Sequence, residues 1–277
     1  MTYLRLGPRP LDYQPVRYAG SRLTFRGPCR DLGPGYVACL GGTETYGSFV
    51  ARPWPALLEE RVGTCCVNFG LPNAGPDVFL ADDGLIRLAQ GARAVVLQIP
   101  PAMNLTNSHY RVHPRRNDRF LLAEHALRDL FPEVDFTEFN FTRHMMQRLG
   151  AISPERFARL RAAVQRVWVA RMTRLIEATA APVILLWMAR HAPGPGTGAA
   201  TVAEDPAFVS RAMLDAIAPH AAATVTAVIS PEARARGTYG MQFQPMEEAT
   251  AASLPGPLAH DEAAAAVFPL LAACLKR

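Results

Sequence analysis

Five short apolar segments, separated by stretches with helical spacing, constrain the fold of this 277-residue chain more than any other feature. Each segment is almost continuously hydrophobic, which is typical of strands buried on both faces of a parallel sheet. The stretches between them repeat apolar residues every three to four positions, as amphipathic helices do. We therefore predict an α/β fold with strands at residues 36–40, 65–69, 94–99, 182–188 and 223–229.

The length and the order of these segments favour one domain with two additions. Residues 1–34 are rich in Pro, Gly and Arg, and we expect an irregular leader packed on the domain. Residues 35–277 form the domain itself, with a helical insertion at about 119–179. Helices are also expected at 77–90, with Asp77 as the N-cap and Gly91 as the stop, and from about 261 to 275.

Composition excludes several classes of protein. The chain has 29 Lys and Arg against 24 Asp and Glu, and this mild excess is spread along it, so we expect no nucleic-acid partner. We find no apolar stretch of about 20 residues and expect no membrane span. The five cysteines match no metal-binding spacing, and with no signal-peptide core at the N-terminus they favour a reducing cytoplasm. No metal and no cofactor are predicted, and the oligomeric state is left open.

Polar residues gather directly after the predicted strands. In a parallel sheet the ligand crevice lies beyond the carboxyl ends of the strands, so these residues are expected to meet there. They supply a hydroxyl, glycine turns, amides and an imidazole, which is the set that acyl transfer needs for a nucleophile, an oxyanion hole and a base. The residues are Thr43, Gly70, Asn73, Asn104, Asn107 and, just before the last predicted helix, His260.

The order of these residues resembles the SGNH (GDSL-like) hydrolase superfamily over residues 35–107 and the last twenty residues. The resemblance implies a flavodoxin-like three-layer α/β/α fold. It also implies Thr43 as the nucleophile in place of the usual Ser, His260 as the general base, and Gly70 N–H and the Asn104 amide as oxyanion donors. Pro257 stands where the family has the aspartate that orients the histidine. The whole chain further resembles an uncharacterised bacterial family known as a domain of unknown function, most closely in segments 112–119 and 135–143.

A basic segment follows the third predicted strand. It carries His113, Arg115, Arg116 and Arg119, whose side chains could clamp a phosphate, sulfate or carboxylate. The alternative interpretation is a solvated loop paired with nearby carboxylates. Together with Asn73 and Asn107, these four residues are the predicted substrate-binding set.

Two functions of different classes follow from these patterns. The first is an SGNH-like esterase or O-acyltransferase that acts on an acyl group of a polar, anionic or carbohydrate substrate through a Thr43–His260 dyad. The second is a catalytically degraded SGNH-like binding or assembly protein that recognises an anionic ligand through residues 109–119. The Thr in place of Ser and the missing aspartate favour the second. Transfer of a sulfuryl or phosphoryl group by the Arg/His segment is a weaker third hypothesis.

Overall fold

The computed structural model describes residues 10–33, 35–194 and 202–276, and its centre is a five-stranded sheet in which every pairing is parallel. The strand order is β2-β1-β3-β6-β7. The α/β fold and the five-stranded parallel sheet are therefore as predicted, with strand bounds within one or two residues of the expected ones. The strands are β1 (Val37–Gly41), β2 (Cys66–Gly70), β3 (Ala94–Gln98), β6 (Val183–Ala189) and β7 (Ala223–Val228).

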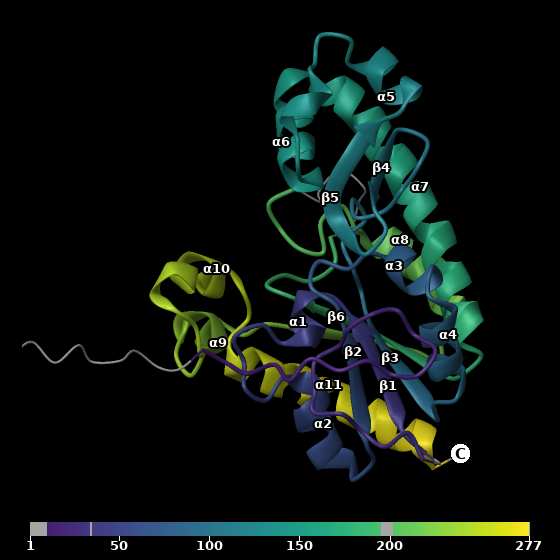
Figure 1. Ribbon diagram of the computed structural model, residues 1–277, viewed down its shortest axis with the longest axis vertical. Coiled ribbons are helices and arrows are strands. Elements are labelled where there is room, and N and C mark those ends of the chain that lie inside the picture. Colours follow the sequence, from purple (N-terminus) through teal and green to yellow (C-terminus); the bar gives the residue numbers. More distant parts are fainter. Residues whose placement is uncertain (1–9, 34, 195–201, 277) are drawn as a thin grey trace, which may run out of the picture.

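Helices cover both faces of this sheet and give the predicted three layers (Figure 1). Along β1, Val37 and Cys39 belong to the core beneath one face, and Ala38 and Leu40 to the core beneath the other. Because successive residues of this apolar strand are buried on opposite faces of the sheet, both faces must be covered by other elements. One face is covered by α2 (Trp54–Val62) and α11 (Pro257–Leu275), and the other by α3 (Pro76–Leu80), α4 (Asp83–Gln90), α7 (Pro154–Thr179) and α8 (Arg211–Ile217).

The described part of the leader, residues 10–33, contributes apolar side chains to the core beneath one face of the sheet. A single β-bridge joins Val16 to Phe25, and Tyr18 and Phe25 are both buried with their rings against Phe69 of β2. Residues 1–9 and 34 of the predicted leader lie outside the described residues. The irregular segment that the structure describes thus supplies apolar rings that finish one face of the sheet.

The insertion differs from the prediction at its start. A β-hairpin of β4 (Tyr110–His113) and β5 (Arg116–Ala123) precedes the helices, so residues 119–123 are strand and not helix. Asn117, Phe120 and Ala123 of β5 are buried, at a spacing of three residues in a hairpin with an irregular register, so the sequence shows no simple alternation of apolar and polar residues. The helices that follow are α5 (His125–Leu130), the short η1 (Phe136–Glu138), α6 (Thr142–Ile152) and the long α7.

The helix predicted at 77–90 is two helices. It breaks at Asp82, whose side chain accepts a hydrogen bond from Leu85 N at 2.8 Å and so caps α4. The residue that precedes α3 is Gly75, which corrects the predicted Asp77 cap, whereas α4 ends at Gly91 as predicted. One capping carboxylate in mid-segment is sufficient to restart the helix.

The C-terminal region contains short helices and then the long α11. The short elements are η2 (Ala218–His220), α9 (Pro231–Ala235), η3 (Pro245–Glu247) and α10 (Glu248–Ser253). α11 begins at Pro257, four residues before the predicted start, so His260 lies inside its first turn. Segment Pro245–Leu275 is long and apolar enough to cross a membrane by length and composition, which corrects the expectation that no such stretch exists; within it, α11 places Ala263, Val267 and Leu271 in the core beneath one face of the sheet.

Candidate functional site

The turn after β1 holds the predicted nucleophile. Thr43 is the first residue of α1 (Thr43–Tyr46), and the glycine before this turn has no room for a side chain, because a Cβ on Gly41 would lie 2.0 Å from Thr45 Oγ1. The buried Gln98, at the end of β3, fastens the turn. Its Oε1 accepts hydrogen bonds from Gly42 N at 3.1 Å and from Thr45 N at 3.1 Å. The end of β3 is thereby hydrogen-bonded to the turn after β1 that carries Thr43.

Three predicted residues do meet at the strand ends. Thr43 Oγ1 accepts a hydrogen bond from Asn73 N at 3.0 Å and donates to Asn73 Oδ1 at 3.2 Å. Asn104 Nδ2 donates to Asn73 O at 3.1 Å. Asn73 has φ +56, a left-handed conformation that asparagine tolerates better than most residues. The convergence of Thr43, Asn73 and Asn104 follows from the parallel topology.

Two residues of the insertion extend this network, and sequence reasoning missed both. Thr142, the first residue of α6, donates from Oγ1 to Asn104 Oδ1 at 3.0 Å. Asp118 on β5 accepts a hydrogen bond from Asn73 Nδ2 at 3.2 Å. The hairpin and α6 are therefore joined to the strand ends, α6 through a buried side-chain hydrogen bond and the hairpin through an exposed one.

Two adjoining cavities open beside this network, and we call them together the strand-end cleft. One has a volume of about 50 Å³ and the other of about 400 Å³, and Asn73, Asn104 and Arg143 line both. The smaller is also lined by Thr43, Glu44, Gln98, Asp205 and Met188, and the larger by Asp118, Phe141, Thr142, His144 and Gln147. Their combined size is that of a small-molecule site.

The smaller cavity has an acidic group beside the hydroxyl. Glu44 Oε2 accepts a hydrogen bond from Gln98 Nε2 at 2.7 Å, which ties this carboxyl to the same turn. Burial raises the pKa of the Glu44 carboxyl, and the negative charge of Asp205 raises it further. Asp205 itself is held by both carboxylate oxygens to Arg143 Nη2 at 2.6 and 2.7 Å. The sequence signal for Glu44 was its place next to Thr43.

The backbone N–H of Gly70, predicted as an oxyanion donor, already donates a hydrogen bond within the protein. This N–H donates to Asn68 Oδ1 at 2.9 Å, and an added Cβ would lie 2.3 Å from Tyr46 N. The glycine is required because the backbone of α1 packs directly over it. Asn104 likewise uses one of its amide hydrogens on Asn73 O. These contacts give Gly70 a packing role in place of the expected oxyanion role.

His260, the predicted base, lies in the interior and not in the cleft. Its side chain is 1% exposed, and its Nδ1 accepts a hydrogen bond from Trp54 N, the first N–H of α2, at 3.2 Å. Burial lowers the pKa of this imidazole to about 3, and the positive charge of Arg26 lowers it as well. Thr43 and His260 have separate hydrogen-bond partners, so the structure does not assemble the expected dyad.

The basic segment is distributed over the hairpin and does not act as one clamp. His113 Nδ1 accepts hydrogen bonds from Arg115 N and Arg116 N, each at 3.2 Å, and so holds the turn between β4 and β5. Arg119 lies over the Phe141 ring at 5.5 Å, at the edge of the cleft. Asn107 accepts from His109 N at 2.8 Å and stabilises its own loop, which corrects its predicted place among the substrate-binding residues.

The remaining two arginines of the segment have different surroundings. Arg116 Nε lies 3.8 Å from Asp118 Oδ1, so Arg116 pairs with a carboxylate that lines the cleft. Arg115 lines another cavity, beside Pro114 and Arg22. Of the six predicted substrate-binding residues, Asn73 alone lines the strand-end cleft, and Arg116 and Arg119 approach it through Asp118 and Phe141.

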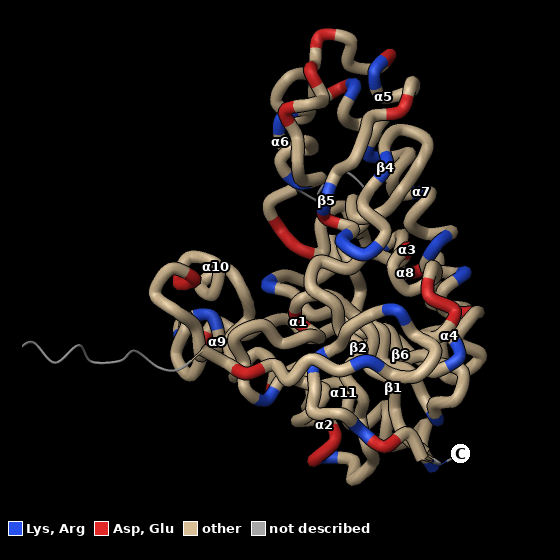
Figure 2. Tube along the Cα trace, viewed as in Figure 1, with Lys and Arg blue, Asp and Glu red and all other residues tan. Residues whose placement is uncertain are grey.

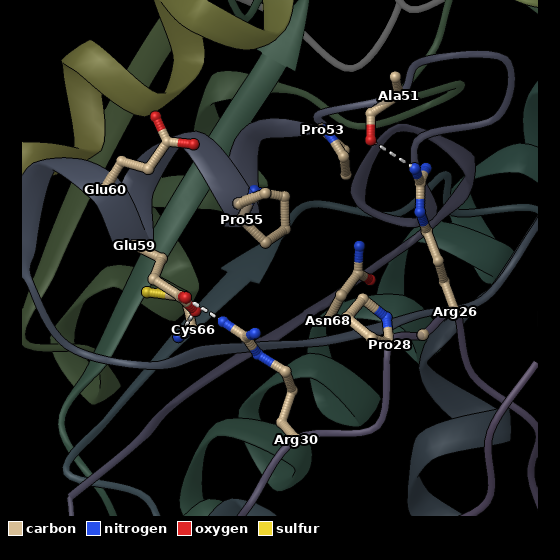
Figure 3. A pocket seen from close by; sticks show the side chains of 12 residues that line it. Arg26, Pro28, Arg30, Ala51, Pro53, Pro55, Glu59, Glu60, Cys66 and Asn68 are labelled. Atoms are coloured by element: carbon tan, nitrogen blue, oxygen red, sulfur yellow. Dashed lines mark hydrogen bonds and ion pairs between the residues drawn. The ribbon is translucent and has the colours of Figure 1, made fainter. Parts of the chain in front are cut away.

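A further cavity of about 220 Å³ lies over β2 and α2 (Figure 3). Its charged side chains already have partners: Arg30 is paired with Glu59, and Arg26 donates from Nη2 to Ala51 O at 2.8 Å. Paired groups of this kind stabilise the packing of the leader on α2. Over the described ranges, no group of three or more His, Cys, Asp or Glu is placed to hold a metal ion.

The fold and the site define an α/β protein with a polar cleft at the carboxyl ends of a parallel sheet. The family model described as "Domain of unknown function (DUF6473)" matches residues 1–275, and the chain belongs to this family. No curated protein matches the sequence. Among solved structures, the lipase Lip_vut3 from a goat rumen metagenome is similar over 85% of this chain and 96% of its own, at 10% identity and a TM-score of 0.42.

Proposed function

We propose that the protein binds a hydroxyl-rich, saccharide-like ligand in the strand-end cleft, and that it does so as an SGNH-like protein without a Thr43–His260 dyad. The hydrogen bond from Trp54 N to His260 Nδ1 in the interior supports the absence of the dyad, and the polar lining of the cleft supports the class of ligand. A general base must come within about 3 Å of the proton that it takes, directly or through one water. An imidazole with its ring nitrogen held inside the core does not meet that requirement.

The lining of the cleft suits a ligand rich in hydroxyl groups. Thr43 supplies a hydroxyl, Asn73 and Asn104 supply amides, and Glu44 supplies a carboxyl that accepts hydrogen bonds. Phe141, 43% exposed, offers an apolar ring face at the wider end. Because acidic and basic groups are both present in the cleft, its chemistry favours a neutral sugar over a strongly charged one.

The test is binding and turnover measured on the same preparation. Glucose, galactose, N-acetylglucosamine and their uronic acids are titrated by saturation-transfer NMR, and p-nitrophenyl acetate is the acyl probe. We expect saturable binding of at least one sugar, weakened about fivefold in Thr43→Val, since a lost hydrogen bond to the ligand is worth roughly 1 kcal/mol. Thr137→Val, on the exposed η1 turn, is the matched control and leaves binding unchanged. Absence of binding by every sugar contradicts the proposal.

A second candidate function is acyl transfer by Thr43 with Glu44 as the base. The raised pKa of Glu44, in the same cavity as the Thr43 hydroxyl, favours it. Thr43 Oγ would bond to the acyl carbon as the ester C–O bond breaks. Its proton would pass to the Glu44 carboxylate and then to the leaving alkoxide. A fluorophosphonate adduct on Thr43, lost in Glu44→Gln, would replace the binding proposal by this one. An unmodified Thr43 supports binding alone.

A further inference from the structure

A groove lined by arginines lies on the other side of β5 from the strand-end cleft. Successive strand residues point to opposite faces, and on β5 Asp118 lines the cleft whereas Asn117 lines this groove. Asn117 Oδ1 accepts hydrogen bonds from Gly75 N at 3.0 Å and from Val78 N at 3.1 Å, which fixes α3 as the groove floor. The groove is therefore a separate and rigidly built feature.

The groove consists of two neighbouring cavities, of about 290 and 190 Å³, that share Ala81 and Pro114 in their lining. Arg171 and Arg174 of α7 line the larger cavity, and Arg22 and Arg115 line the smaller. Figure 2 shows positive segments along α7 and at the turn between β4 and β5, the two elements that flank α3. Four guanidinium groups thus border one continuous depression.

The two carboxylates in the groove are largely satisfied by the protein itself. Asp82 accepts hydrogen bonds from Leu85 N and Arg22 N, each at 2.8 Å. Asp77 Oδ2 accepts from Thr106 N at 2.7 Å, and its Oδ1 lies 3.3 Å from Arg171 Nε. Within the described ranges, Arg115 and Arg174 have no ion pair. The balance of charge in the groove is positive.

We propose that this groove, between α7 and the β4–β5 turn, binds a small molecule that carries a phosphate or sulfate group. Guanidinium groups form paired, charge-assisted hydrogen bonds to such oxyanions, and arginines on two different elements can grip one from both sides. The proposal is independent of the function assigned to the strand-end cleft. It follows from the arginines that face the groove and from the internal use of its carboxylates.

The test is calorimetric titration of the full chain with phenyl phosphate and, separately, phenyl sulfate, at constant ionic strength in chloride. Saturable binding of either probe supports the groove, and the stronger of the two identifies the headgroup. Arg174→Gln and Arg115→Gln are each expected to weaken binding about tenfold. Arg159→Gln removes one charge from an exposed position of the same helix and is expected to leave the affinity unchanged.

A variant that is expected to strengthen binding makes the test sharper. Asp77→Asn removes the negative charge but keeps an oxygen that can accept the Thr106 N–H, so it should strengthen binding severalfold by freeing Arg171. A thermal melt of each variant confirms that it is folded. Failure of both probes to bind, or an equal loss in Arg159→Gln and Arg174→Gln, overturns the proposal. Sugar binding at the strand-end cleft is unaffected by either result.

Discussion

Thr43 and His260 both lie in the first turn of a helix but have opposite environments. Thr43 begins α1, directly after β1, whereas His260 belongs to α11, which follows β7 and three short helices. Thr43 lines the strand-end cleft and bonds to Asn73, whereas His260 is buried and bonds to the backbone of α2. The same residue types that form a hydrolytic dyad elsewhere are here a hydroxyl that lines the cleft and a buried imidazole.

This difference shows that chemistry depends on exposure as well as on residue type. Around Thr43, side-chain hydrogen bonds connect the loops after β2 and β3 with β5 and α6, and a cavity lies beside them. Around His260, apolar residues of α2 and α11 close the space, and burial keeps the ring neutral. A buried neutral imidazole with one nitrogen already bonded stabilises two helices but cannot serve as a base for Thr43.

The largest expected loss of stability comes from a substitution that disrupts the packing of the loops near Thr43. Gly75→Ala would put a Cβ 1.6 Å from Asn104 O, a backbone atom that cannot move aside. We expect a loss of about 3 kcal/mol in the free energy of unfolding, the upper part of the range for overpacking. Urea denaturation measures it. Gly33→Ala is the control, since only the Asp31 side chain lies near that position, at 3.7 Å or more. Equal stability of Gly75→Ala and wild type would contradict the described packing.

A somewhat smaller effect is expected in the pH dependence of stability, which depends on the burial of His260. The folded-state pKa is about 3 and the ordinary value 6.5, so between these values the unfolded chain binds a proton that the folded chain does not. The contribution is fully present above pH 6.5 and is lost as the pH falls towards 3. The stability lost by pH 5, relative to pH 8, amounts to about 2 kcal/mol.

His260→Asn removes this titration and keeps an acceptor for Trp54 N. Urea denaturation at pH 8 and pH 5 should show the acid-side loss of stability reduced by about 2 kcal/mol in the variant. An identical pH dependence in wild type and variant would mean that His260 is exposed.

The hydrogen bonds that join α6 and the β4–β5 hairpin to the strand ends are expected to contribute less to the free energy of unfolding. Thr142→Val removes the hydroxyl that donates to Asn104 Oδ1 and lies 3.2 Å from Asp118 O, and it leaves buried acceptors unsatisfied. A loss of about 1–2 kcal/mol is expected. Thr226→Val, on the exposed face of β7, is the control and should change stability by less than about 0.5 kcal/mol. Similar losses in the two variants would refute the network.

The smallest effect concerns the charge beside Thr43. In Asp205→Asn the ion pair with Arg143 is lost, and because both side chains are partly exposed we expect a change of only about 0.5 kcal/mol in stability. The pKa of Glu44 should fall towards its ordinary value, since the charge of Asp205 helps to raise it. Carboxyl NMR of Glu44 across pH measures this. An unchanged or higher pKa in the variant would show that the two carboxyls do not interact.

Much of the fold could be predicted because apolar runs specify the strands and parallel topology brings their ends together. Thr43, Asn73 and Asn104 met for that reason. The orientation of His260 could not be predicted: each helical residue turns a side chain by about 100°, so starting α11 four residues early redirects the ring. The arginine-rich β5 was also missed.

Other members of the site gave weaker signals. Gln98 was visible as a polar side chain at the end of an apolar strand, a position that needs internal hydrogen bonds when it is buried. Asp118 and Thr142 gave no local signal. Their roles depend on how the insertion folds back over the sheet, which involves contacts between distant segments.

The protonation state of the His260 ring decides most directly whether Thr43 has an imidazole base beside it, and histidine NMR with ¹⁵N labelling measures it. We predict that His260 stays neutral from pH 8 down to about 4, with Nδ1 unprotonated and hydrogen-bonded, and that Thr43→Val leaves its shifts unchanged. A titration midpoint near 6.5 that moves in Thr43→Val would contradict the account, because the ring would then be exposed and in contact with the hydroxyl.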